Sequence, residues 1–187
     1  NDKHVCASNQ SEIMVFDAAN GNLIFKSGNK LEAARALISS KTSSRFLAEF
    51  SQKIELRDFS APSFVRTIEL KNKKWIFNGI CAGMGTNLFY TYESTGVLSI
   101  YTLDEAKQLF ERNIGEVGPF NGEFLGDTAI LYFDLHGKPT LWNFARNSLK
   151  VFTGFCEIGA IRNHQLYPKS NLLISTAYNN IYFWNFR

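Results

Sequence analysis

A repeat of about 42 residues constrains this chain more than any other feature of its sequence. Five stretches share the same order of features: a turn, a strand, a polar residue, a short turn and a second strand. They can be aligned on the polar residue at the end of the first strand. We call this residue the anchor; the five anchors are Asp17, Asp58, Thr102, Asn143 and Asn185. Successive anchors are 41, 44, 41 and 42 residues apart. Such a period is typical of propellers, in which each repeat forms one four-stranded blade.

The composition and the turn pattern favour the same fold. Of the 187 residues, 45% are hydrophobic, which is enough to bury a core. Short runs rich in Val, Ile, Leu, Phe and Tyr alternate with Gly, Asn, Ser and Asp turns, as expected for strands. We therefore predict an all-β, partial β-propeller of four-stranded antiparallel blades. Its parts are a partial blade at 4–26, complete blades at 33–70, 75–112 and 120–153, and a partial blade at 160–187.

Two segments, 29–38 and 103–113, also have the residue types and spacing of helices. The repeat places the first in a connection between blades and the second in a hairpin within a blade. We therefore predict that neither is helical.

The two end pieces lack different strands. With the strands of a blade lettered a to d from the axis outward, the first piece lacks strand a and the last piece lacks strand d, so the two cannot merge into one blade. An open arc leaves sheet edges unpaired and apolar faces bare. We therefore expect further blades, from the parent chain or from a partner, which would complete a ring of about seven blades.

Two stretches resemble the WD-repeat family. They are YPKSNLLISTAYNNIYFWNF at 167–186 and HVCASNQSEIMVFDAANGNLIF at 4–25. The Trp-Asp pair of that family stands here as Trp184-Asn185 and Trp142-Asn143. Phe16, Arg57 and Tyr101 occupy the tryptophan position in the other repeats.

The resemblance lacks one family feature. The Gly-His dipeptide is absent from every repeat, so the buried network of His, Asp and Ser or Thr cannot form in full. A buried polar network stabilises a protein only when its members are satisfied, so we expect apolar packing to replace it.

The resemblance implies a rigid, non-catalytic scaffold for protein–protein interaction in an intracellular multiprotein complex, cytoplasmic or nuclear. The residues agree with this implication. Three scattered cysteines fit reduced thiols, and three histidines in different repeats show no metal-ligand spacing. The carboxylates of Asp104 and Glu105 are best explained as parts of a turn. We predict no enzymatic activity, no cofactor, no small-molecule substrate and no membrane span.

The candidate contact residues come from charge and aromatic clusters. The net charge is only +3, but the run KNKKW at 71–75 is strongly basic. With residues at comparable places of the neighbouring blades it predicts a positive patch of Lys30, Lys71, Lys73, Lys74 and Arg112. A solubilising loop is the simpler interpretation, and contact with RNA phosphates or an acidic peptide is the functional one. Tyr92 and Tyr178 flank turns between strands b and c and are candidates for exposed contact residues.

Two alternative functions remain open. In the first, the chain is a subunit of an RNA-associated complex, for example in ribosome assembly, and binds RNA through the lysine patch. In the second, it is the propeller portion of a larger enzyme.

Overall fold

The chain forms an all-β structure in the part that the computed structural model describes. The described residues are 3–9, 12–27, 34, 36–40, 43–50, 53–59, 64–69, 81–82, 86–93, 95–115, 122–133, 138–152, 163–177 and 180–185. Within them the chain has antiparallel strands and one short 3-10 helix, η1 (Pro168–Ser170). The prediction of an all-β chain with antiparallel sheets is confirmed.

The strands form five sheets, numbered here in chain order. Sheet 1 consists of β1 (His4–Ser8), β2 (Ile13–Asp17) and β3 (Leu23–Lys26). Sheet 2 consists of β4 (Ala36–Ser39), β5 (Arg45–Glu49), β6 (Lys53–Asp58) and β7 (Phe64–Glu69). Sheet 3 consists of β8 (Cys81–Ala82), β9 (Leu88–Tyr92), β10 (Val97–Thr102) and β11 (Gln108–Asn113).

Sheet 4 consists of β12 (Glu123–Leu125), β13 (Ala129–Phe133), β14 (Pro139–Asn143) and β15 (Ser148–Val151). Sheet 5 consists of β16 (Asn163–Tyr167), β17 (Leu172–Ala177) and β18 (Asn180–Asn185). Apart from Asn113 at the end of β11, the described strands lie within the segments 4–26, 33–70, 75–112, 120–153 and 160–187. In the segment 103–113, whose composition also suits a helix, β11 forms as predicted.

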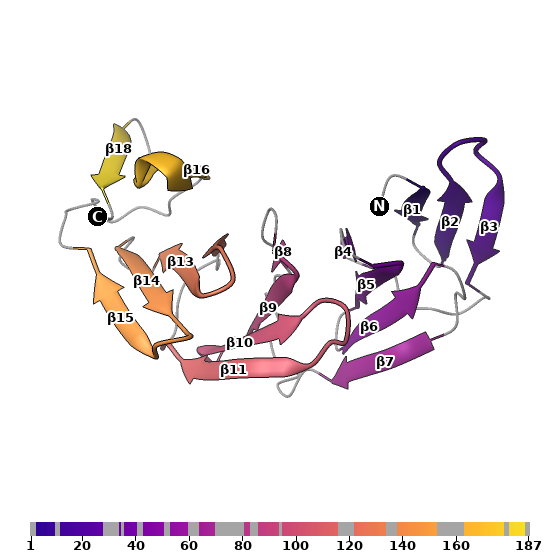
Figure 1. Ribbon diagram of the computed structural model, residues 1–187, viewed down its shortest axis with the longest axis horizontal. Helices are drawn as coiled ribbons and strands as arrows, with labels where there is room; N and C mark the ends of the chain where they lie inside the picture. The colour runs from indigo at the N-terminus through magenta and orange to yellow at the C-terminus, as the bar shows by residue number, and fades with distance from the viewer. Residues whose placement is uncertain are drawn as a thin grey trace.

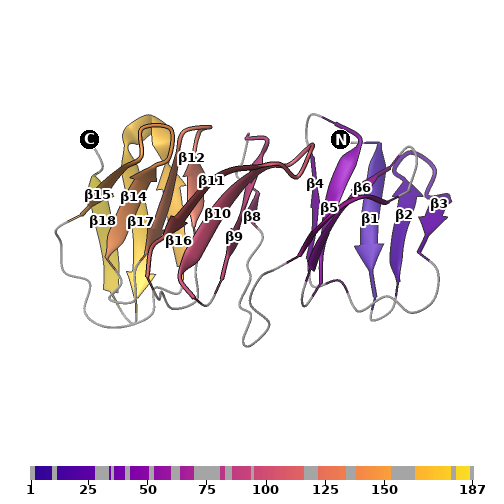
Figure 2. The same ribbon diagram turned by 90° about the horizontal axis from the view of Figure 1, so that it is seen from below.

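The sheets stand side by side in an open arc (Figure 1). β4 and β8 lie on its concave side, and β7, β11 and β15 lie on its convex side. Figure 2 shows the sheets face to face along the arc, from sheet 1 in indigo to sheet 5 in yellow. Successive residues of a strand point to opposite faces, so the middle sheets contact a neighbour on both sides.

The core consists of apolar layers between neighbouring sheets. In sheets 1 to 3, the residues two and four positions before the anchor point toward the following sheet. In sheet 2 these are Leu56 and Ile54, which pack with Phe89 and Tyr101 of sheet 3. Both are 0% exposed. Burying such a side chain contributes about 1.5–3 kcal/mol, so stacking of the sheets is the main source of stability.

Three of the five anchors stabilise the turns that follow them. The side-chain oxygen of Asp17 accepts a hydrogen bond from the backbone N–H of Ala19 at 2.8 Å, and that of Asn143 accepts one from Arg146 at 2.9 Å. The hydroxyl of Thr102 accepts one in the equivalent turn. A short side chain with an acceptor oxygen is sufficient for this purpose, which explains why Asp, Asn and Thr share the position.

Replacing Asp17 with alanine is expected to lower the free energy of unfolding by about 1 kcal/mol, because the turn loses one hydrogen bond. Asp17→Asn is the matched control and is expected to be nearly neutral, since Asn143 makes the same type of bond in sheet 4. Urea denaturation of both variants measures the difference. Equal losses for the two variants would contradict the assigned role of the side-chain oxygen.

Candidate functional site

The predicted basic patch lies mostly outside the described residues. This holds for Lys30, Lys71, Lys73 and Lys74, and Tyr178 also lies outside them. Arg112 is described. Its Nη1 on β11 donates a hydrogen bond to Oδ1 of Asn147 at 2.9 Å, in the turn between β14 and β15. Arg112 therefore links sheet 3 to sheet 4, and the patch as a whole stays a prediction.

Tyr92 is buried, so the expectation that it is exposed is wrong. The residue is 2% exposed and belongs to the apolar layer between sheets 3 and 4. Its hydroxyl donates a hydrogen bond to the carbonyl oxygen of Gly115 at 3.4 Å. All five residues of β9 are buried because neighbouring sheets cover both faces of this strand.

A buried hydrogen bond between two side chains joins β17 and β18 in sheet 5. The indole Nε1 of Trp184 donates a hydrogen bond to Oγ of Ser175 at 2.9 Å, and both residues are buried. At the equivalent positions, sheet 4 has Trp142 and Tyr132. Tyrosine carries its hydroxyl at the far end of a ring. Among the described residues, Nε1 of Trp142 has no hydrogen-bond partner.

The two tryptophans provide a matched test of this hydrogen bond. Trp184→Phe is expected to cost about 1 kcal/mol more than Trp142→Phe, because only Trp184 loses a hydrogen bond and leaves Ser175 unsatisfied. The two substitutions remove the same side-chain volume. The free energies of unfolding in urea give the difference. A larger loss for Trp142→Phe would show that the bond contributes nothing.

In sheet 2, Arg57 stands at the position of Trp142 and Trp184, and it forms a buried ion pair with Glu55. Arg57 donates from Nη2 to the Glu55 carboxylate at 2.6 Å, and Lys53 donates to the same carboxylate at 2.6 Å. Glu55 is 4% exposed. Burial by itself raises the pKa of the Glu55 carboxyl. The hydrogen bonds and charges of Lys53 and Arg57 together outweigh burial, so the pKa lies below its ordinary value. The sequence contained a signal for this site. Lys53, Glu55 and Arg57 are two positions apart along the strand, so their opposite charges lie on one face of it.

A second polar cluster joins sheets 2 and 3. The carboxylate of Asp104, in the turn after β10, accepts hydrogen bonds from the hydroxyls of Ser40 and Ser43 and from the amide of Asn87. Arg45 donates to the backbone oxygen of Asp104. These contacts support the structural interpretation of the carboxylate in this turn.

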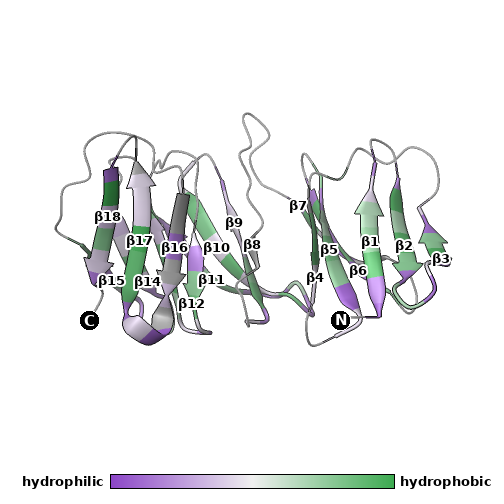
Figure 3. Cartoon of the chain, turned by 90° about the horizontal axis from the view of Figure 1, so that it is seen from above, coloured by the Kyte–Doolittle hydropathy of each residue, from purple (hydrophilic) through white to green (hydrophobic). Residues whose placement is uncertain are grey.

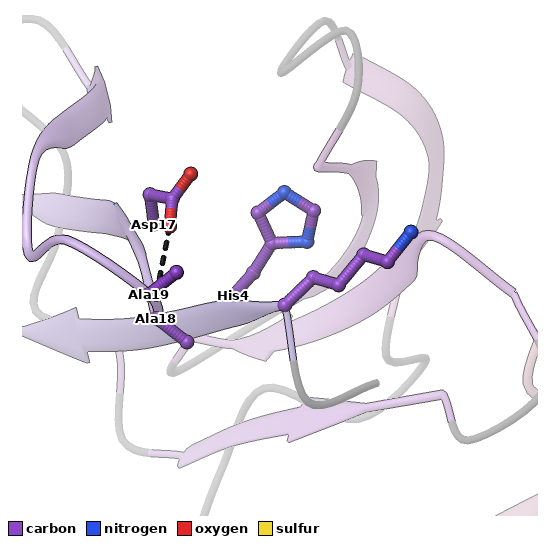
Figure 4. A pocket seen from close by; sticks show the side chains of 5 residues that line it. His4, Asp17, Ala18 and Ala19 are labelled. Carbon is purple, nitrogen blue, oxygen red and sulfur yellow. Dashed lines mark hydrogen bonds between the residues drawn. The ribbon is translucent and has the colours of Figure 1, made fainter.

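Two cavities adjoin at the first histidine, His4. The larger, of about 410 Å³, lies at one end of sheet 1 and is lined by Lys3, His4 and the turn from Asp17 to Ala19. Figure 4 shows the imidazole of His4 and the carboxylate of Asp17 at this cavity. The smaller, of about 150 Å³, lies between sheets 1 and 2. Its lining consists of His4, Cys6, Leu37, Ile38, Ser39, Phe46 and Phe59.

The groups at these cavities do not form a catalytic arrangement. Burial raises the pKa of the Cys6 thiol to about 12, so the thiol stays protonated and is a poor nucleophile at neutral pH. The His4 ring stacks on Phe59, with ring centroids 4.9 Å apart. In the described part of the chain, no three His, Cys, Asp or Glu residues are grouped so as to hold a metal ion. Nor is any described helix long and apolar enough to cross a membrane.

The most exposed apolar side chains lie at the ends of the arc. In sheet 5, Ile181 is 62% and Phe183 is 68% exposed. In sheet 1, Val5 is 53% exposed. Figure 3 shows hydrophobic colour along strands at both ends, including β18 and β1. The sequence contained this signal, because Ile181 and Phe183 stand four and two positions before their anchor.

Comparisons with known proteins support the fold alone. No family model and no curated protein matches the sequence. The crystal structure of the computationally designed Ika8 protein has a TM-score of 0.71 and 12% identity, and the match covers 100% of this chain and 56% of that chain. The structure of U3-55K has a TM-score of 0.66 and 13% identity, and the match covers 98% and 58%. The chain thus spans less than two thirds of the length of both structures.

Proposed function

We propose that this chain is part of a WD-repeat-like β-propeller and serves as a non-catalytic scaffold for protein–protein interaction within an intracellular multiprotein complex. The five sheets are its blades, and further blades extend the arc toward a ring of about seven. The observation that carries the proposal is the apolar face of sheet 5 around Ile181 and Phe183.

The repeat shows what normally covers this face. The residues equivalent to Phe183 in sheets 1 to 3 are Val15, Leu56 and Ile100, and each is 0% exposed against the following sheet. Large exposed apolar patches on proteins commonly mark sites of protein contact. A protein surface with the character of another blade is therefore the expected cover for sheet 5.

The polar residues also support a structural role. The described carboxylates of Asp17, Glu55 and Asp104 accept hydrogen bonds that hold turns, strands or neighbouring sheets together. Of these three, Glu55 and Asp104 line neither of the two cavities at His4, whereas a catalytic carboxylate faces a cleft in which a substrate can bind.

The test is affinity purification of the protein from its native source, beside a variant with Ile181→Asp and Phe183→Asp. The scaffold proposal expects a stoichiometric protein partner that survives nuclease and is lost from the variant. Amide exchange is expected to be slower at 180–185 in the complex than in the free chain. Purification of the wild-type protein without any stoichiometric partner would contradict the proposal. A partner that nuclease or moderate salt removes would favour the RNA-associated alternative.

A further inference from the structure

The outer strand of sheet 4, β15, is a second candidate interaction site, separate from the exposed face of sheet 5. Sheet 4 has the strand order β12-β13-β14-β15, so β15 is its edge. It lies on the convex side of the arc (Figure 1). The sheet already contains all four strands of the repeat, so the repeat assigns no further strand to this edge. Edge strands present unpaired N–H and C=O groups to which another strand can add.

β15 is exposed along its whole length. All four of its residues are exposed, among them Leu149 at 42% and Val151 at 52%. In the outer strands β3 and β11, by contrast, Phe25 and Phe110 are partly buried and pack against apolar layers between sheets. The side chains of β15 are therefore all within reach of another molecule.

The register shows which backbone groups face the open edge. The N–H of Phe152 donates to the carbonyl of Pro139 at 3.0 Å, on the side of β14. Backbone bonding alternates along an antiparallel strand, so Lys150 bonds to β14 as well. The N–H and C=O groups of Leu149 and Val151 therefore point toward the open edge.

The same two residues lie beside an apolar layer of the core. Leu149 is opposite Trp142 in the pairing of β14 with β15, and Val151 is opposite Thr140. Directly opposed residues share a face of the sheet. Trp142 belongs to the buried layer between sheets 3 and 4, so Leu149 and Val151 lie on the face that carries this layer. An aliphatic residue added opposite either of them would extend this apolar face.

The charge around β15 has one sign. Residues 138–152 contain Lys138, Arg146 and Lys150 and no Asp or Glu. Arg112 of sheet 3 adds a fourth basic side chain, through its hydrogen bond to Asn147 in the turn before β15. The outer strands β7 and β11, in contrast, each contain one Glu and one Arg. The surroundings of β15 therefore complement a negatively charged partner.

The side chains of β15 distinguish between kinds of partner. A second copy of β15 is disfavoured, because like charges on paired strands repel and an edge lysine such as Lys150 opposes self-association. Single-stranded nucleic acid binds by stacking its bases on aromatic side chains, and β15 contains none. An acidic polypeptide matches the backbone groups, the aliphatic side chains and the charge together.

We propose that β15 binds an extended acidic segment of a partner protein as a fifth strand of sheet 4, antiparallel to β15. Addition of a strand to an open edge is a general mode of peptide recognition, in which main-chain hydrogen bonds give affinity. The segment has aliphatic residues opposite Leu149 and Val151 and an acidic residue opposite Lys150. Successive side chains alternate between the two faces, so a segment of alternating aliphatic and acidic residues meets both requirements.

The test uses a capped synthetic peptide, Glu-Val-Glu-Val-Glu, titrated into the purified protein and followed by NMR and amide hydrogen exchange. Binding is expected to slow exchange of the Leu149 and Val151 amides by about tenfold or more. The Lys150 amide already bonds to β14 and is expected to change little. Because Ile181 and Phe183 take no part in this experiment, its failure leaves the proposed function untouched.

Two N-methylated peptides provide a matched control for the backbone. Methylation of a valine nitrogen removes an N–H that faces β15, and methylation of the central glutamate nitrogen removes one that faces away. The first peptide is expected to bind about tenfold more weakly than the second.

Two lysine variants provide a matched control for the charge. Lys150→Glu is expected to weaken binding of the acidic peptide by about tenfold. Lys107→Glu makes the same change in charge at an exposed position just before β11 and is expected to bind like the wild-type protein. Both positions are exposed, so thermal stability is expected to change little.

Four results would overturn the proposal. They are equal binding of the two methylated peptides, equal losses for the two lysine variants, unchanged exchange of the Leu149 and Val151 amides, and slow exchange of these amides before peptide is added. The last would show that a segment of the same polypeptide already covers the edge. Tighter binding of a single-stranded RNA oligomer than of the peptide at these amides would assign the strand to nucleic acid instead.

Discussion

Replacing Gly96 with alanine is expected to lower the free energy of unfolding by about 2–5 kcal/mol. A Cβ at this position would lie 2.5 Å from the backbone oxygen of Gly115, closer than carbon and oxygen can approach. The backbone of Gly96 also has φ of +88°, where an L-residue pays roughly 1–2 kcal/mol. Overpacking a tight contact costs about 1–3 kcal/mol more. Relief would require the backbone at Gly115 to move, which strains the bond from Ile114 N–H to the carbonyl of Gly96.

Gly126→Ala is the matched control for this prediction. Gly126 also has positive φ, at +63°, but a Cβ there would meet nothing within 4 Å. Its loss is therefore expected to be limited to the backbone cost of roughly 1–2 kcal/mol. Urea denaturation of both variants gives the comparison. Similar losses for the two would show that the contact between Gly96 and Gly115 is not the cause.

The sequence predicts most of the fold because one period governs it. The anchors locate the ends of the central strands, and the turn chemistry of Asp17 and Asn143 follows from short side chains that carry an acceptor. The period also decides ambiguous segments. Residues 103–113 have helix-forming composition, yet β11 forms at Gln108–Asn113 because pairing with β10 overrides local propensity.

The sequence was less informative about which strand faces are covered. Tyr92 stands beside a turn, and a single exposed tyrosine is a reasonable expectation there. In a stack of sheets, however, both faces of a middle strand are buried, so the alternation that distinguishes inside from outside disappears. The run from Leu88 to Tyr92 shows this directly, since every residue is buried.

Polar contacts between sheets were not predictable for a different reason. Asp104 accepts hydrogen bonds from Ser40 and Ser43, which are more than 60 residues away along the chain. No local spacing encodes such a contact, because it depends on how two neighbouring sheets are rotated relative to each other.

The buried ion pair of sheet 2 leads to the second large prediction. Replacing Arg57 with leucine is expected to lower the free energy of unfolding by about 3–5 kcal/mol, because it leaves Glu55 charged in a buried site with only Lys53 as a partner. Glu55→Leu in the same protein is expected to restore most of this loss. A buried ion pair replaced as a whole by apolar residues of similar volume is often neutral or stabilising.

The dependence of stability on pH checks the same assignment. The pKa of Glu55 is lower in the folded protein than its ordinary value of 4.5, so the pair stabilises the fold fully above that pH. This contribution is lost as the pH falls below about 4.5 through the folded pKa. Urea denaturation between pH 3 and 7 is therefore expected to show a steeper loss at acid pH for the wild-type protein than for the variant with both Glu55→Leu and Arg57→Leu. The wild-type protein and the double variant could instead show the same dependence of unfolding free energy on pH, or the losses of the two single variants could simply add in the double variant. Either result would mean that the two side chains do not stabilise each other.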